Sequence, residues 1–318
     1  MDVPVFPWQV PLSPWQKFRR APAEFLVRWL NEWRTAPADC PSPPQPAGTP
    51  PIRVVCISDT HDTEPSVPDG DVLLHAGDLT DKGTFEELQA QLDWLKSLPH
   101  KHKVVIAGNH DRLLDAEYVA RFPDRIYEGP GTSRSDLNWG DLVYLNDDSV
   151  KLHLPGDRTL SIYGSPLTEQ CGTFAFQYPP IREVWHRRIP DDTDVLLVHG
   201  PPRGYLDNGG KGCPQLLREI WRVRPRLVVF GHIHAGYGQR VLRYDDGAET
   251  AYASVFMRAR GVLAVCPMVW HVLLQKVQRL LPSFLRTSTD PLYGMFVNAA
   301  MMGGKDGDGI REPLIVEL

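Results

Sequence analysis

The stretch VVFGHIHAGYG, residues 228–238, begins as an apolar run and stops abruptly at Gly231. Two histidines, His232 and His234, follow one residue apart, and more glycine comes after them. The end of a buried strand has no structural need for two imidazole rings, because polar groups are costly to bury. A metal site at the strand end would use both, and it would also need ligands from other strands.

Four other apolar runs in this chain also end in side chains that can bind a metal. The five predicted strands cover residues 52–59, 71–78, 102–111, 194–202 and 226–232. The candidate metal ligands at or beside their ends are Asp59, His61, Asp78, Asn109, His199, His232 and His234. Ligands bind at the carboxyl ends of strands in open α/β sheets, so we expect these side chains to converge. So many ligand-type residues at successive strand ends predict a metal centre rather than structural histidines.

The chemistry of these side chains limits which metals could bind and which reactions the site could catalyse. The set contains imidazoles, carboxylates and one amide but no thiolate, which suits Mn, Fe or Zn. The ligands outnumber what one tetrahedral ion takes, so we expect two ions, with Asp78 as the bridging carboxylate. A hydroxide held between two metals can attack phosphorus near neutral pH. Such a centre is suited to the hydrolysis of phosphate esters.

The leaving alkoxide of such a reaction needs a proton. His110 lies beside Asn109 in the sequence and is the expected general acid. Asp111 is expected to hold the tautomer of that imidazole. The residues alone leave two plainer roles open, a supporting structural role for His110 and loop capping for Asp111.

Residues that would contact the substrate are less clearly indicated. Arg112 follows the GNHD motif and Arg203 follows HGPP. Either guanidinium could bind a phosphate oxygen through its planar fork, or lie in solvent as a surface charge. Asn208 and Tyr237, in flanking loops, are candidates to shape a pocket.

Composition and charge limit the class of protein. The chain has 318 residues, is 42% hydrophobic and carries a net charge of −5, which does not favour nucleic acid as a partner. Five widely spaced cysteines without a CxxC motif indicate neither a disulfide framework nor a thiolate zinc site. The first residues lack the pattern of a signal peptide, and no uncharged apolar run reaches the ~18–20 residues of a membrane span. We therefore expect a cytoplasmic protein.

Five short motifs together resemble the calcineurin-like metallophosphoesterases. They occur in the order of that family as SDTH (58–61), GD (77–78), GNHD (108–111), HG (199–200) and GHIH (231–234). The longer strings LLHAGDLT, LLVHGPPRGYLD and GHIHAGYG are similar to the metallophosphoesterase domain-containing subgroup. That subgroup in turn resembles bacterial class III cyclic-nucleotide phosphodiesterases.

The resemblance implies a fold and an allocation of ligands. The fold is a four-layer αββα sandwich of two mixed sheets and flanking helices, with a dimetal site at the sheet edge. The ligands of one ion would be Asp59, His61, Asp78 and His234. The ligands of the other would be Asp78, Asn109, His199 and His232. Some animal members carry glycine at the position of His232 and are weak enzymes, so His232 here implies an intact second metal position.

The resemblance also suggests the substrate class. It favours phosphodiesters, split by a metal-bridging hydroxide with His110 as the acid. Alternatives are a phosphomonoesterase or protein phosphatase, or a low-activity metal-binding scaffold protein. The expected partner is thus a phosphate-ester small molecule or a phosphoprotein, and no nucleic acid is expected. The sequence indicates no oligomeric state.

Two segments stand apart from the predicted domain at 51–318. Residues 1–50 form a proline-rich arm whose apolar residues from Phe25 to Trp33 recur at helical spacing. The second segment is an insertion at about 245–292, in which 268–285 predicts an apolar helix. The arm and the insertion either pack on the main domain or contact partners. For 262–286, the second reading is an interfacial helix on an anionic membrane or a protein.

Overall fold

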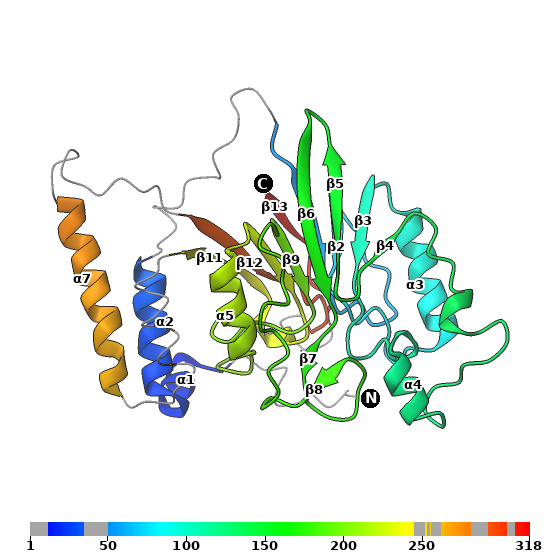
Figure 1. Cartoon of the computed structure of the whole chain (residues 1–318), viewed down its shortest axis with the longest axis horizontal. Helices are drawn as coiled ribbons and strands as arrows, with labels where there is room; N and C mark the ends of the chain where they lie inside the picture. Colours follow the sequence, from blue (N-terminus) through cyan, green and yellow to red (C-terminus); the bar gives the residue numbers. More distant parts are fainter. Residues whose placement is uncertain are drawn as a thin grey trace.

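The computed structural model describes residues 12–34, 50–244, 252, 255, 262–280, 292–303 and 309–318. Most of the proline-rich linker and much of the predicted insertion lie outside the described residues. Within the described part, two large mixed sheets pack face to face, with helices on both outer sides (Figure 1). The fold is therefore the α/β sandwich that the sequence predicts.

The first large sheet has the strand order β13-β1-β2-β3-β4. Its strands are β1 (Arg53–Ile57), β2 (Val72–His75), β3 (His102–Val105), β4 (Val143–Tyr144) and β13 (Leu314–Glu317). The strands from β1 to β4 run parallel, and β13 pairs antiparallel with β1. Because they run in one direction, β1, β2 and β3 all end at the same edge.

The second large sheet has the strand order β11-β12-β10-β9-β6-β5. Its strands are β5 (Asp148–Leu154), β6 (Arg158–Ser165), β9 (Val195–Val198), β10 (Leu227–Phe230), β11 (Gly238–Arg243) and β12 (Tyr293–Asn298). The four central strands are parallel, and the two edge strands are antiparallel to their neighbours. A short pair, β7 (Thr168–Glu169) and β8 (Gln177–Tyr178), lies apart from both sheets.

Alternation along β1 shows how the layers form. Val54 and Cys56 belong to the core between the two sheets, where they pack with residues such as Val229. Val55 and Ile57 point the other way, into the core under the helices of the first sheet. Residues two apart in a strand share a face, so a strand buried on both sides reads as one continuous apolar run.

Helices cover the two outer faces. The first sheet carries α3 (Phe85–Ser97) and α4 (Ala116–Arg121), and the second carries α5 (Pro214–Val223). Short 3-10 turns are η2 (Arg112–Leu114), η3 (Arg134–Asp136), η4 (His234–Gly236) and η5 (Val262–Val265). A capping box begins α3, because the Thr84 side chain accepts the N–H of Glu87 and the Glu87 side chain accepts that of Thr84.

Three helices form one end of the molecule, beyond the second sheet (Figure 1). They are α1 (Pro14–Arg20), α2 (Pro22–Arg34) and α7 (Cys266–Leu280). Ala23, Val27 and Leu30 of α2 are buried in the core on the outer face of the second sheet. The insertion helix α7 packs against α2. None of the described helices combines the length and apolar character needed to cross a membrane.

Candidate metal centre

The predicted ligands follow five strands and meet at one edge of the sandwich. Asp59, Asp78 and Asn109 follow β1, β2 and β3 of the first sheet, and His199 and His232 follow β9 and β10 of the second. The sheets are joined at this edge, since the residue before Asp59 forms a parallel bridge with the residue two positions after β12. The backbone N–H of His232 also donates to both carboxylate oxygens of Asp59, at 3.1 and 3.0 Å.

Several of these residues have a backbone conformation that side chains usually avoid. The φ angles are +53° at Asp59, +44° at His61, +53° at Asp78 and +63° at His232. Left-handed φ values are uncommon outside glycine and carry a conformational cost. Four candidate ligands therefore turn sharply just after a strand, which aims their side chains along the sheet edge.

Glycine at two motif positions permits the close approach of the ligands. A Cβ at Gly108 would lie 2.2 Å from Asp78 Oδ1 and 2.7 Å from His199 Cε1. A Cβ at Gly231 would lie 2.0 Å from Asp59 Oδ2. These distances are too short for any side chain, so the GNHD and GHIH motifs require glycine at their first position.

The ligand atoms form two adjacent groups. One contains Asp59, His61 and His234, and the other contains Asp78, His199 and His232. Within each group the ligand atoms lie within 4.8 Å of one another. The family resemblance likewise separates His61 and His234 from His199 and His232. A third group of close ligand-type atoms consists of His61, Asp81 and His110.

Asp78 lies between the two groups. Its Oδ2 is 3.2 Å from Nε2 of His199 and 3.9 Å from Nε2 of His61. The seventh predicted ligand, Asn109, places its Oδ1 3.1 Å from the same His199 nitrogen. The structure thus brings together all seven residues that the sequence singled out.

Neighbouring groups at Nδ1 orient two of the histidines, His61 and His199, so that Nε2 faces the cluster. The Nδ1 atom of His61 lies 2.9 Å from the carboxylate of Asp81. The Nδ1 atom of His199 lies 2.8 Å from the carbonyl oxygen of Ala76, an acceptor to which it must donate. The buried Nε2 of His61 has no hydrogen-bond partner among the described residues. Buried, oriented and unpartnered imidazole nitrogens beside carboxylates fit a metal cation.

Electrostatics in the cluster keep the carboxylates charged. Burial raises the pKa values of Asp59 and Asp78, but the nearby histidines outweigh it and hold both below the ordinary value. Burial lowers the pKa values of His61 and His199, yet the surrounding carboxylates raise both to about 9. Protons thus balance the buried carboxylates in the metal-free protein, and binding a cation would displace them.

Asp111 has a different role from the one expected. Its carboxylate accepts the N–H groups of Gly108, Leu79 and Thr80, at 2.7, 3.2 and 3.0 Å. Burial, together with the charge of Asp78, raises its pKa to about 6. Asp111 therefore fastens the third ligand loop to the second, and the expectation that it holds the imidazole tautomer is wrong.

The group that holds the His110 imidazole is a backbone carbonyl. His110 Nδ1 lies 2.7 Å from the carbonyl oxygen of Asp81. The ring lies 4.9 Å from the His61 ring and 4.9 Å from the Phe174 ring, measured between centroids. His110 is thus half-buried beside the cluster, with its ring next to the candidate ligand His61.

The two predicted arginines lie in different surroundings. The Arg112 guanidinium lies 5.5 Å above the same Phe174 ring, and its Nε is buried without a hydrogen-bond partner among the described residues. Arg203 instead donates to Glu24 of α2 at 2.8 Å. Its guanidinium therefore ties the N-terminal arm to the HGPP loop, and its position does not support a phosphate contact.

Sequence reasoning missed Asp81 and Phe174. Asp81 lies three residues after Asp78, and an acidic residue so close to a predicted ligand is a signal that could have identified it. Phe174 lies in the segment between β7 and β8, far from every motif, and no sequence pattern indicates its contact with His110.

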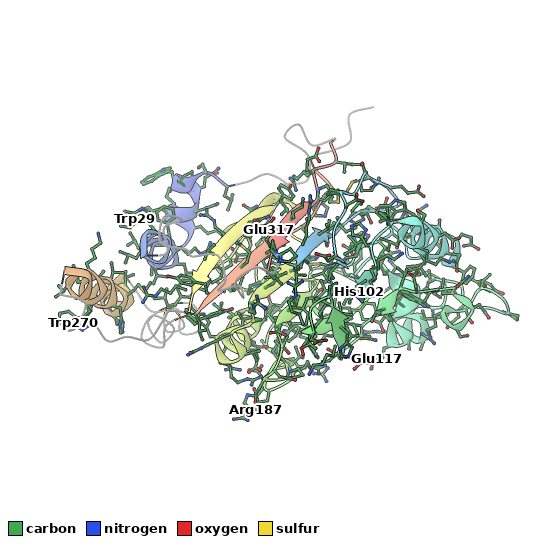
Figure 2. All side chains as sticks on the ribbon, turned by 90° about the horizontal axis from the view of Figure 1, so that it is seen from above. Trp29, His102, Glu117, Arg187, Trp270 and Glu317 are labelled. Atoms are coloured by element: carbon green, nitrogen blue, oxygen red, sulfur yellow. The ribbon has the colours of Figure 1, made fainter. Side chains whose placement is uncertain are left out.

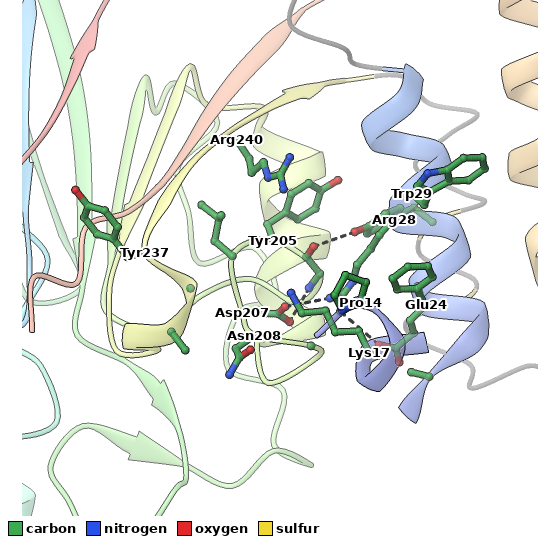
Figure 3. A pocket seen from close by; sticks show the side chains of 18 of the residues that line it. Pro14, Lys17, Glu24, Arg28, Trp29, Tyr205, Asp207, Asn208, Tyr237 and Arg240 are labelled. Carbon is green, nitrogen blue, oxygen red and sulfur yellow. Dashed lines mark hydrogen bonds and ion pairs between the residues drawn. The ribbon is translucent and has the colours of Figure 1, made fainter. Parts of the chain in front are cut away.

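A cavity of about 470 Å³ lies between the arm and the second sheet (Figure 3). Asn208 and Tyr237, the two residues suggested for a pocket, both line it. Lys17 and Trp29 contribute from α1 and α2. The wall on the side of the sheet includes Gly236 of η4, the turn that begins at the ligand His234.

Known proteins resemble the chain to different extents. It is 38% identical over 309 residues to "Probable rhamnogalacturonate lyase C" of Emericella nidulans, covering 96% of this chain and 28% of that protein. It is 40% identical over 222 residues to "Metallophosphoesterase domain-containing protein 1" of Homo sapiens, covering 64% of this chain and 65% of that protein. It is 35% identical over 232 residues to "UPF0046 protein K07C11.7" of Caenorhabditis elegans, covering 70% and 76%.

The chain spans about a quarter of the length of the fungal relative and about two thirds of the human one. The fungal match covers nearly all of this chain, so it includes most of the N-terminal arm and of the segment 245–292. The family model of the calcineurin-like phosphoesterases matches residues 52–236, which include every candidate ligand. The chain therefore belongs to the calcineurin-like phosphoesterase family.

Proposed function

We propose that this chain hydrolyses phosphodiesters in preference to monoesters, with two metal ions held by the seven ligands at the sheet edge. Family membership supports hydrolysis of phosphate esters, and the His and Asp groups support metal binding. The observation that carries the proposal is the position of Asp78, within 4 Å of a histidine from each ligand group. The preference for a diester rests on the resemblance of the longer motif strings to the diesterase-like subgroup.

Each ion would have its own ligands. Asp59, His61 and His234 would hold one, and His199 and His232, with Asn109, would hold the other, while Asp78 serves both. The ions would be divalent cations such as Mn, Fe or Zn, which suit nitrogen and oxygen ligands. When bound, they would supply an activated water and stabilise negative charge on the phosphoryl oxygens.

His110 is held so that one nitrogen can exchange a proton. The carbonyl of Asp81 can only accept, so Nδ1 of His110 carries a hydrogen. To act as the acid the ring must be the imidazolium, in which Nε2 holds a second proton that it gives to the leaving oxygen. The backbone N–H of His110 donates to Asp78 Oδ1 at 2.8 Å, which fixes the acid relative to the shared ligand.

Arg112 is the proposed phosphate contact. Its guanidinium shares the Phe174 ring with His110, and its buried Nε has no partner among the described residues. An arginine fork in this place would bind a phosphoryl oxygen not taken by the metals.

The four described cysteines are free thiols, in keeping with a reducing compartment such as the cytoplasm.

The test is metal content and activity measured on one purified sample. After reconstitution with Mn²⁺, we expect two ions per chain and faster turnover of an aryl phosphodiester than of the matching monoester. His110→Ala should keep both ions and lower turnover about 10²–10⁴-fold, because it removes only the proton donor. His153→Ala is the matched control, since His153 is exposed on β5 away from the site.

Three results would each contradict part of the proposal. Unchanged turnover in His110→Ala would remove this residue as the acid. Two bound ions without turnover of any phosphate ester would favour a binding protein that has kept its metal site. Faster turnover of the monoester, or of a phosphopeptide, would overturn the preference for diesters and leave the hydrolase intact.

A further inference from the structure

The insertion helix α7 has two apolar stripes. The first stripe is buried. It consists of Met268 and Val272 of α7, together with Val265 just before the helix. This stripe belongs to the same core as Val27 of α2, so it fixes α7 to the N-terminal arm. An amphipathic helix that only covers a core needs no second apolar stripe.

The second stripe faces solvent. Trp270, Leu273, Leu274 and Val277 follow at spacings of three, one and three residues, which places them on one face of a helix. Their exposed fractions are 61%, 52%, 39% and 56%. Leu263 in η5 is 84% exposed and precedes them. These are large apolar side chains gathered on one element, and such a patch marks an interaction surface.

The charge of this segment differs from that of the whole chain. From residue 251 to residue 286 the sequence contains five Lys or Arg residues and no Asp or Glu, although the chain carries a net charge of −5. Lys276 is exposed on α7, beside the second stripe. An apolar face that contains Trp and Leu, in a segment whose only charged residues are basic, suits the surface of an anionic bilayer.

The position of α7 leaves this face accessible. The helix lies at one end of the molecule, outside α2, and Trp270 lies at the outer margin (Figure 2). We propose that α7 is an interfacial anchor that lies in the plane of an anionic membrane, with Trp270, Leu273 and Val277 among the acyl chains. It has 15 residues, which is shorter than a membrane span, so the proposal is for attachment at the surface.

The test is flotation of the full chain with vesicles. We expect it to float with vesicles of phosphatidylcholine and phosphatidylserine, to remain at the bottom with phosphatidylcholine alone, and to detach at high salt. The double variant Trp270→Glu/Leu273→Glu should lose binding at least about 100-fold. Lys276→Gln should lower it roughly five-fold, since one basic residue near the surface contributes about 1 kcal/mol.

The controls separate lipid binding by α7 from misfolding and from self-association. Ile181→Glu changes a side chain that is 95% exposed elsewhere, so it should float like the original chain. Both stripe positions are exposed, and an unchanged unfolding temperature would show that the double variant folds. The proposal is overturned if the chain does not float with anionic vesicles or if the double variant floats equally well. It is also overturned if the stripe joins two copies, which size-exclusion chromatography would show as a dimer that the double variant abolishes.

Discussion

Gly231 lies where the ligands of the second sheet meet those of the first. A Cβ there would lie 2.0 Å from Asp59 Oδ2 and 2.1 Å from Ser58 Oγ, so Gly231→Ala must displace the Asp59 carboxylate. That carboxylate lies 3.1 Å from His234 Nε2 and also accepts the N–H of His232. We expect the variant to lose about 1–3 kcal/mol of stability, as overpacked cores do, and to retain less metal. Thermal unfolding and metal content after dialysis measure both effects.

Gly200→Ala is the matched control for this substitution. Gly200 follows the ligand His199, but the nearest atom to a Cβ there is Thr168 Cγ2, at an ordinary 3.5 Å. We expect Gly200→Ala to keep its metal and its stability within about 0.5 kcal/mol. If the two variants lost stability and metal to the same extent, the close packing of Asp59 against Gly231 would not be the reason that the site needs glycine there.

The sequence could indicate the candidate ligands but not the roles of the residues in the loops around them. The ligands follow apolar runs directly, so strand ends were enough to predict their convergence. The roles of Asp111 and Arg203 depend on which way a loop turns after its strand. Asp111 turns back to backbone N–H groups, and Arg203 turns outward to a helix more than 170 residues earlier in the chain. No local pattern carries that information.

At the scale of elements, strands that are continuous apolar runs were predictable, and strands with several exposed polar residues were not. The central strands, such as β1 and β10, are continuous apolar runs because both of their faces are covered. The strands β5 and β11 were not predicted, because they lie at sheet edges and carry several exposed polar residues. The two-residue strands β4, β7 and β8 are too short to show any period.

The docking of α2 depends on a buried charge pair. Asp207 is 1% exposed, lies 3.4 Å from Arg28 and accepts the N–H groups of Gly204 and Gly212. Burial raises its pKa, but Arg28 and these N–H groups outweigh it and hold the pKa below its ordinary value. We expect Asp207→Asn to cost about 3 kcal/mol at pH 7, because Arg28 loses the nearer of its two carboxylate partners among the described residues and keeps Glu24, at 3.5 Å. Thermal unfolding of both proteins measures the difference.

The difference in stability between the original chain and Asp207→Asn should depend on pH in a definite direction. A carboxyl whose pKa is lowered by folding stabilises the folded state above its ordinary pKa, and that contribution is lost as the pH falls. The gap between the chain and Asp207→Asn should therefore be full at pH 7 and shrink below about pH 4. Asp93→Asn, which breaks an exposed pair with Lys96 on α3, should leave the unfolding temperature unchanged. A gap that did not depend on pH would exclude the charge as its cause.

At the scale of the whole molecule, the candidate metal centre lies where the two sheets meet. Its candidate ligands come from both sheets, and the contacts between Asp59 and the GHIH loop cross the interface between the sheets. The two sheets are otherwise held together by the apolar core between them. The continuous apolar runs of the central strands predict this core well. What the sequence could not show is that the arm and α7 add a third packed unit beyond the second sheet. Their contacts depend on side chains distant in sequence.

A metal that bridges two sheets should stabilise the whole fold. A ligand that binds only the native state adds about 2.7 kcal/mol when present at 100 times its Kd. Mn²⁺ added to chelator-treated protein should therefore raise the unfolding temperature until the site is saturated. Asp78→Asn, which removes the carboxylate that lies between the two groups, should abolish most of this rise, whereas His153→Ala should keep it. Two bound ions without any rise would mean that the sheets are held together by their apolar core alone.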